Sequence, residues 1–466
     1  MAANTPTPNG PKRTFLQKYS GKQFFIIVSV VTVVLLLDTS IIRISDLTLK
    51  STSSWAIGLF AIIAGISLVG QNLILRLIKQ KVDEGTAAQK SLPLNSIHKA
   101  AVTVHYILAT LLVFVILQML ITSRYDVVLL TTGVTISYVF AIIMMVILCY
   151  RFFSWFRLNK SYVVSLYGLS SITLAANIGI TLWVVNSILL ALPGQVMPHP
   201  ILNVPSFSAN PVNIIPNYAF IITTIASFII TWCATTIGLL KNYTHRTGKF
   251  TYWMLLILPL GYFVSQFLVF SLGLLGPVLI LNPIFYGILF TILFTLTKPI
   301  GGIIFGIGFW MIAKNIRKNN VIRSYLIISG YGFLLLFASN QAIALTFAYY
   351  PPFGLVTISF VGLSAYLVLL GIYSSAISMS KDATLRREIR RLAIKESKLL
   401  DSIGSAQIED EVRKRVLHIA RLNKIDLGGA GLPSALDEED VNQYLGDVLK
   451  EINTIKKKDS FTNEKS

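Results

Sequence analysis

The sequence predicts an all-α membrane protein, a polytopic bundle of about ten transmembrane helices followed by a small cytoplasmic helical tail. Three observations lead to this fold class. Hydrophobic residues make up 54% of the chain and charged residues only 13%, about half the usual charged fraction of soluble domains. Apolar runs of about 20 residues recur along the chain, and basic residues gather in alternate loops between them. The net charge of +19 therefore serves membrane orientation and does not require a nucleic-acid partner.

Ten apolar runs are long enough to cross a bilayer as helices, because a helix satisfies its backbone polar groups internally. They are residues 24–42, 55–78, 102–122, 127–150, 161–192, 217–240, 252–276, 283–313, 322–346 and 354–378. The first run is longer than a signal-peptide core and has no small-residue cleavage site, so we interpret it as a retained span. This divides the chain into a cytoplasmic N-terminal segment (1–23), the bundle (24–378) and the tail (379–466).

Basic residues in the loops predict the orientation. With the N-terminus inside, 19 Lys and Arg residues precede or connect the spans on the cytoplasmic side. The outer loops then hold only Arg43, Lys50 and Arg124. By the positive-inside rule, we expect a multi-pass protein of the cell membrane with both termini in the cytoplasm.

Two of the runs are irregular. Run 161–192 is about 12 residues longer than a crossing needs, so we expect it to tilt or to project beyond the outer surface. Run 283–313 is interrupted at Lys298-Pro299-Ile300-Gly301-Gly302, where proline removes a helix hydrogen bond and a kink or break is expected. Such breaks hold substrate sites in some transporters and serve only packing in other membrane proteins.

Small residues at helical spacing predict faces on which helices pack closely. They occur four residues apart in three of the runs: Ala61 and Gly65; Ser171, Ala175 and Gly179; Gly302 and Gly306. This spacing is common in polytopic proteins and indicates a compact bundle, without any chemistry of its own.

Polar side chains inside the runs are the candidate ligand or pathway residues, because burying them in lipid is costly. Five of them, from five runs, fall about 22–27 Å from the cytoplasmic ends at 1.5 Å per residue, in the outer half of the membrane. They are Asp38, Asn177, Gln266, Lys298 and Asn340. This polar layer either satisfies itself by interhelical hydrogen bonds or lines a water-filled pocket open to the outside. Gln71, Asn72 and His105 fall nearer the inner face.

Asp38 and Lys298 are the ionisable residues of opposite sign that lie well inside the runs. Their similar height predicts an ion pair, either direct or through one water molecule. Pairing recovers part of the cost of inserting each charge. We also expect carbonyl groups freed before Pro299 to accept the remaining donors of Lys298.

The sequence contains no enzymatic constellation. His105 is the one histidine inside the runs, and HExxH, HxxxxD and paired-Asp motifs are missing. Cys149 and Cys233 lack CxxC spacing, so they are interpreted as buried apolar residues. We therefore expect no catalytic residue, no metal and no cofactor.

The tail is predicted to form three short amphipathic helices. Neither proline nor glycine occurs between Gly371 and Gly404, so the last span is expected to continue as one rod over residues 355–403. Gly404 permits a break before a second helix at about 406–422. A glycine-rich joint at 428–431 and a third helix from about residue 437 follow. So small a module is unlike an enzyme domain.

Four arginines directly follow the last span, namely Arg386, Arg387, Arg390 and Arg391. They are predicted either to contact anionic lipid headgroups or to form a solvated basic face. The apolar faces of the tail helices predict a cytoplasmic protein partner for residues 380–466. In the other exposed segment, residues 193–216, six prolines and no Lys, Arg, Asp or Glu predict an extended outer cap or a plain connector.

This layout favours an integral membrane receptor, sensor or scaffold that couples the transmembrane bundle to the cytoplasmic tail. The alternative is a transporter or channel for a small solute that uses the polar layer and the break at Pro299. The expected partners are the lipid bilayer and a cytoplasmic protein. No residue pattern identifies the ligand.

Overall fold

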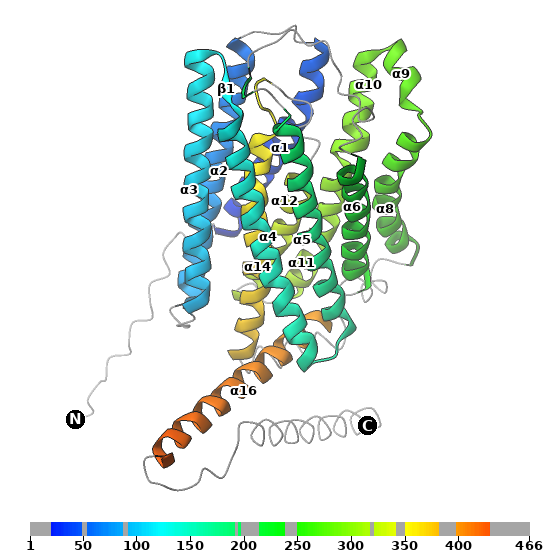
Figure 1. Cartoon of the computed structure of the whole chain (residues 1–466). Coiled ribbons are helices and arrows are strands. Elements are labelled where there is room, and N and C mark those ends of the chain that lie inside the picture. The colour runs from blue at the N-terminus through cyan, green and yellow to red at the C-terminus, as the bar shows by residue number, and fades with distance from the viewer. Residues whose placement is uncertain are drawn as a thin grey trace, which may run out of the picture.

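A computed structural model of the chain (Figure 1) describes residues 20–48, 54–86, 92–191, 194–196, 214–237, 249–316, 321–341, 350–381 and 398–428. The helices are α1 (Ser20–Thr48), α2 (Ser54–Thr86), α3 (Leu92–Thr122), α4 (Val127–Leu158), α5 (Tyr162–Leu189), α6 (Ile214–Thr235), α8 (Lys249–Ser271), α9 (Leu275–Leu281), α10 (Pro283–Phe290), α11 (Thr297–Asn315), α12 (Val321–Ser339), α14 (Leu355–Lys381) and α16 (Lys398–Gly428). A π-helical turn, η5 (Thr291–Thr295), lies between α10 and α11.

Ten helices within these ranges are long and apolar enough to cross a membrane, and each of the ten predicted runs overlaps one of them. The all-α fold class is thereby confirmed, and the apolar helices indicate a multi-pass membrane protein. One small β element was not predicted. Strands β1 (Tyr125–Asp126) and β2 (Gln195–Val196) pair antiparallel, with Tyr125 opposite Val196.

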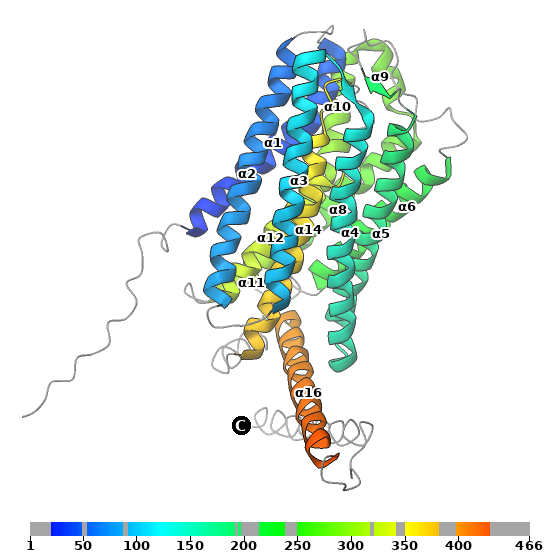
Figure 2. The same ribbon diagram turned by 60° about the vertical axis from the view of Figure 1, so that its left-hand side comes forward.

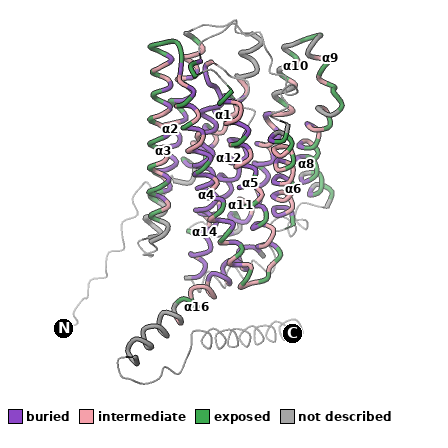
Figure 3. Tube along the Cα trace, in the orientation of Figure 1, coloured by how far each residue is buried: buried purple, intermediate pink, exposed green. Residues whose placement is uncertain are grey.

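Helix α14 forms the centre of the bundle. In its apolar stretch 94% of the residues are buried, compared with 78% in α12 and 28% in α3. Figure 3 shows this gradient, with buried residues along α14 and exposed residues along the outer face of α3. Helix α14 packs against α12 and α4, whereas α11 packs on the other side of α12. The central helices are therefore α11, α12 and α14, with α1 to α6 and α8 around them.

Glycines bring the three central helices close together. A Cβ atom at Gly306 of α11 would lie 2.8 Å from the carbonyl oxygen of Gly330 in α12, and one at Gly332 would lie 2.7 Å from the Val368 nitrogen in α14. The predicted close face at Gly306 is therefore confirmed. The one at Gly65 is wrong, since a Cβ there would meet no described atom within 4 Å.

The predicted break in run 283–313 is confirmed, and the structure places it just before Pro299. Helix α10 ends at Phe290, the π-turn occupies Thr291–Thr295, and α11 begins at Thr297. Pro299 thus lies in the first turn of α11, where a missing backbone N–H costs no intrahelical bond. At about 1.5 Å per residue, α11 is roughly 28 Å long and its first turn remains within the bundle.

The predicted rod over residues 355–403 is wrong. In a straight helix, Ser380 and Glu411 would be about 46 Å apart, but the Ser380 hydroxyl donates to Glu411 Oε1 at 2.9 Å. Helix α16 instead lies across the end of the bundle and then leaves it at an angle (Figures 1 and 2). It also runs through Gly404 without the expected break.

Burial of apolar surface explains this docked arrangement. Residues Leu399, Leu400, Ile403 and Ala406 are at most 1% exposed, whereas a projecting rod would leave them in water. Gly404 permits the contact, since a Cβ atom there would lie 2.8 Å from Met379 Cε. The four tail arginines, the third tail helix and most of segment 193–216 lie outside the described residues.

Candidate functional site

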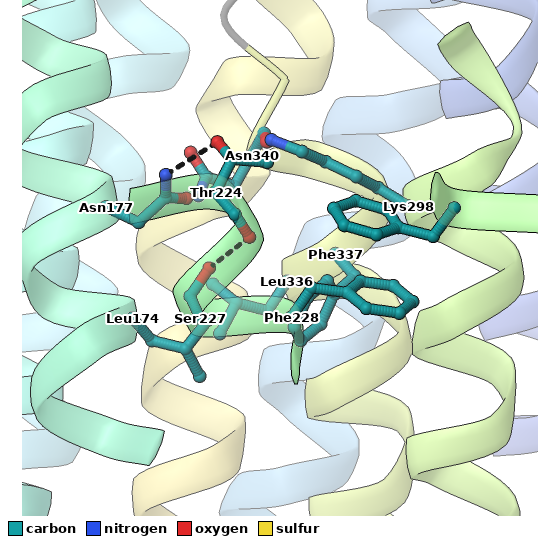
Figure 4. A pocket seen from close by; sticks show the side chains of 10 residues that line it. Leu174, Asn177, Thr224, Ser227, Phe228, Lys298, Leu336, Phe337 and Asn340 are labelled. Atoms are coloured by element: carbon teal, nitrogen blue, oxygen red, sulfur yellow. Dashed lines mark hydrogen bonds between the residues drawn. The ribbon is translucent and has the colours of Figure 1, made fainter. Parts of the chain in front are cut away.

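A cluster of amide and hydroxyl groups joins three segments inside the bundle (Figure 4). The Asn177 amide on α5 donates to Thr224 Oγ1 at 2.9 Å and to Thr223 Oγ1 at 3.3 Å, both on α6. Directly after α12, the Asn340 amide donates to Asn177 Oδ1 at 2.9 Å. Asn177 is 2% exposed and Asn340 is 4% exposed. Two members of the predicted polar layer, Asn177 and Asn340, are therefore joined by an interhelical hydrogen bond.

Lys298, in the first turn of α11, points its amine at this cluster. Its Nζ donates to the backbone oxygen of Asn340 at 3.2 Å and lies 5.0 Å from the centroid of the Phe220 ring on α6. Because Asn340 follows the last residue of α12, the cation meets the negative end of that helix dipole. The aromatic face adds a cation–π attraction.

Gln266 on α8 lies at the edge of this site. Its Oε1 accepts from the Thr297 hydroxyl at 3.3 Å, and its Nε2 is buried with no partner among the described residues. Beside it, the carbonyl groups freed by the π-turn have their own donors. Gln341 Nε2 donates to the Thr295 oxygen at 3.1 Å, and the Tyr262 hydroxyl donates to the oxygen of Ile292. The side chains of Gln341 and Tyr262 thus donate to the backbone carbonyl groups at the break, where Lys298 had been predicted to do so.

A small cavity lies within the cluster. Its polar lining comes from Asn177, Thr224, Ser227, Lys298 and Asn340, and its apolar lining from Leu174, Phe228, Phe263, Leu336 and Phe337. The centre of a water molecule has about 10 Å³ of free space there, which is room for about one water. In this conformation the site therefore fits a single small particle and is far too narrow for a sugar or an amino acid.

Asp38 serves a different purpose from that predicted. Its Oδ2 accepts hydrogen bonds from the Gly354 N–H at 3.1 Å, the Thr357 N–H at 3.0 Å and the Thr357 hydroxyl at 2.7 Å. These groups belong to the first turn of α14 and the residue just before it. A carboxylate from α1 therefore caps the N-terminus of the central helix, where a negative charge is favoured.

The predicted direct ion pair of Asp38 with Lys298 is wrong. Among the described residues, no carboxylate oxygen lies within 4.0 Å of Lys298 Nζ. Both charges lie at the same end of the bundle because α12 ends and α14 begins there, and each is held by one of those two helix ends. Asp38 and Lys298 therefore lie at a similar height, as predicted, but each charge interacts with a helix terminus.

A second hydrogen-bonded chain connects α2, α3 and α14. His105 Nδ1 lies 2.8 Å from Gln71 Oε1, and Gln71 Nε2 donates to Ser359 Oγ at 2.8 Å. About two turns away on α3, His98 Nδ1 lies 2.8 Å from the Tyr366 hydroxyl. His98 was not predicted as a buried polar residue because it precedes the apolar run at 102–122. These groups satisfy one another. A second cavity, with about 20 Å³ of free space, lies beside Ser359, but its other lining residues are apolar or glycine, from Leu108 to Ile358, and it holds no charged group.

Thr223, Thr224 and Phe220 also belong to the site without having been singled out. Threonine and phenylalanine are ordinary residues of apolar helices, so no composition signal marks them. In the part of the chain that is described, no three His, Cys, Asp or Glu side chains are grouped as metal ligands would be.

Comparison with family models, with curated proteins and with solved structures finds no match to this chain. Fold and site together define a multi-pass helical membrane protein with an enclosed polar cluster beside a broken helix.

Proposed function

We propose that this protein is a membrane receptor or sensor, in which the state of the polar cluster is transmitted to helix α16. The single observation that carries the proposal is the seating of α16 on the bundle. Besides its four buried apolar residues, Gln407 Oε1 accepts from Trp155 Nε1 at 3.0 Å, and the Ser402 oxygen accepts from Asn159 Nδ2 at 3.3 Å. A helix held this closely responds to shifts of the helices beneath it.

Helices α4, α5 and α14 connect the cluster with α16. Helix α5 carries Asn177 and contacts α16. Helix α4, which packs along α5, supplies Trp155 to the docking surface, and Asn159 follows directly after its last residue. Helix α14 begins beside the end of α12 and reaches α16 through Ser380. A rigid-body shift of these packed helices therefore changes both ends together. From the loop charges, we place α16 on the cytoplasmic side of the cell membrane, where it is available to a protein partner.

Hydrogen exchange of α16 tests this coupling in the full-length protein. Asn177→Leu removes the link between α5, α6 and α12, and we expect the amides of residues 398–414 to exchange faster in this variant. Ile172→Leu is the matched control, because Ile172 lies on the same helix and is 46% exposed on the outer face. Unchanged exchange in α16 of a folded Asn177→Leu variant would contradict the receptor proposal.

The broken helix favours a second candidate, a transporter of a small solute. Helix α11 begins and α12 ends at the polar cluster, and helix ends within a membrane bundle are a recurrent way of building solute sites. Transport requires the narrow cavity to open alternately to the two sides. Solute flux into liposomes that contain the protein, abolished by Asn177→Leu but not by Ile172→Leu, would support this candidate over the receptor.

A further inference from the structure

We propose that the cavity beside Lys298 binds a small monovalent anion of the size of chloride. The inference supplies a ligand class for the proposed receptor and, for its signalling role, rests on that proposal. Anion binding itself follows from the charge, the free donors and the size of the cavity, and it is tested without reference to α16.

The charge of the cavity is the first argument. Its lining contains one cation, Lys298, and no acidic residue. The end of α12 supplies about half a negative charge, and Phe220 supplies only a quadrupole. Lys298 is half-buried, and an ammonium group withdrawn from water is stable when its charge is balanced. The remaining positive charge therefore favours an anion over a neutral or cationic occupant.

Free hydrogen-bond donors are the second argument. An ammonium group has three N–H donors, and among the described residues Lys298 uses one of them, on the Asn340 oxygen. Thr224 Oγ1 accepts from Asn177, and its own hydrogen has no acceptor in the described part of the chain. Both side chains line the cavity. The same lining holds one acceptor without a partner in the described part of the chain, Asn340 Oδ1. Two N–H groups and one O–H group thus outnumber the single free acceptor, which favours an occupant that accepts.

The size and the walls of the cavity are the third argument. Space for about one water molecule excludes phosphate, sulfate and organic acids in this conformation. Phe228, Phe263, Leu336 and Phe337 form the remaining walls, and this low-polarity surrounding strengthens the attraction between the ammonium and an anion. A monatomic anion satisfies all three conditions.

Thermal unfolding of the purified full-length protein in detergent tests the inference. Sodium chloride is exchanged for sodium gluconate at constant ionic strength, since gluconate is too large for the cavity. We expect the melting temperature to rise saturably with chloride, by about 1–2 °C at ten times the dissociation constant. Lys298→Met should abolish this rise. Lys314→Met, an exposed position near the end of the same helix, should retain it.

A second variant keeps the test decisive if Lys298→Met does not fold. Asn177→Asp places a carboxylate in the lining of the same cavity and supplies the missing anion from within the protein. We expect this variant to lose the chloride dependence and to melt in gluconate about as high as the wild type does in chloride. A wild-type protein that melts equally in both salts, as it would if the cavity held only water, overturns the inference. Full chloride dependence in Asn177→Asp overturns it as well.

The failures of the two proposals are distinguishable. Chloride-dependent melting with unchanged hydrogen exchange in α16 between the two salts would support the anion site and refute its role in a receptor. If Asn177→Leu speeds hydrogen exchange in α16 but the melting temperature is the same in chloride and gluconate, the receptor proposal stands and the anion-site proposal is refuted. Faster exchange of α16 in gluconate than in chloride supports both.

Discussion

Removing the Asp38 carboxylate provides a direct test of how this bundle holds its buried charges. Asp38 is fully buried and caps the first turn of α14 with three hydrogen bonds. In Asp38→Ala, two backbone N–H groups lose their acceptor, and the Thr357 hydroxyl keeps only its longer hydrogen bond to the Leu35 oxygen, at 3.3 Å. In Asp38→Asn, an amide oxygen remains to accept, but the negative charge at the helix N-terminus is lost.

The expected magnitude follows from these contacts. Three hydrogen bonds contribute roughly 1 kcal/mol each to the free energy of unfolding, and the charge at the helix end adds about 1 kcal/mol. Against this, Asp38 Oδ1 is buried without a partner in the described residues, a cost of about 1–2 kcal/mol that substitution relieves. We expect Asp38→Ala to lower the free energy of unfolding by about 2–3 kcal/mol and Asp38→Asn by about 1–2 kcal/mol.

A double-mutant cycle with Lys298→Met separates helix capping from ion pairing. Because each charge has its own helix end, the two losses should add to within about 0.5 kcal/mol. The assay is reversible unfolding in mixed micelles by added sodium dodecyl sulfate, followed by tryptophan fluorescence. Asp126→Ala is the matched control, since Asp126 caps α4 through the Val128 N–H at 2.8 Å and should cost about 1 kcal/mol. Partial rescue of Asp38→Asn by Lys298→Met would refute the reasoning and restore the ion pair.

Three further predictions concern orientation, packing and docking. A cysteine introduced at Ser206 should react with an impermeant maleimide added outside intact cells, whereas one at Thr244 should not; the reverse would refute the predicted orientation. Gly371→Ala should lower the melting temperature by several degrees, because its Cβ would lie within 2.7 Å of backbone atoms of α12, whereas Gly65→Ala, in open space, should leave it unchanged or raise it. Trp155→Phe removes the hydrogen bond to α16 and loosens the ring contacts with Phe152 and Tyr373, so it should speed proteolysis within α16 and lower the melting temperature of the bundle slightly; equal cleavage rates would argue against tight docking.

Much of the helical architecture can be predicted from the amino-acid sequence. Each of the ten apolar runs overlaps a helix that is long and apolar enough to span a membrane, because lipid permits few other backbone structures. The break near Pro299 was also readable, since proline and glycine act on their own helix. By contrast, the rod over residues 355–403 failed because helix propensity is local, whereas the burial of Leu399 and Ile403 depends on where the ends of α4 and α14 lie.

The residues of the candidate site could be predicted only in part from the sequence. Asn177, Lys298 and Asn340 were found from their polarity and height and do come together. Their partners Thr224 and Phe220 carried no such signal, and Gln266 lies only at the edge of the cluster. Height along a helix can be counted from the sequence, but the direction in which a side chain points around the bundle axis cannot.

Asp38 and Lys298, the two charges inside the bundle, show most clearly what the sequence determines and what the tertiary structure determines. The sequence by itself placed Asp38 and Lys298 at one level, because a fixed rise per residue converts position into depth. Only the tertiary structure decided that they do not meet. It brings the N-terminus of α14 to Asp38 and the end of α12 to Lys298, and these helix ends stabilise charge through dipoles and unpaired backbone groups. Which helix end reaches which side chain depends on the packing of α1, α11, α12 and α14, a set of contacts between segments more than 300 residues apart at the extreme.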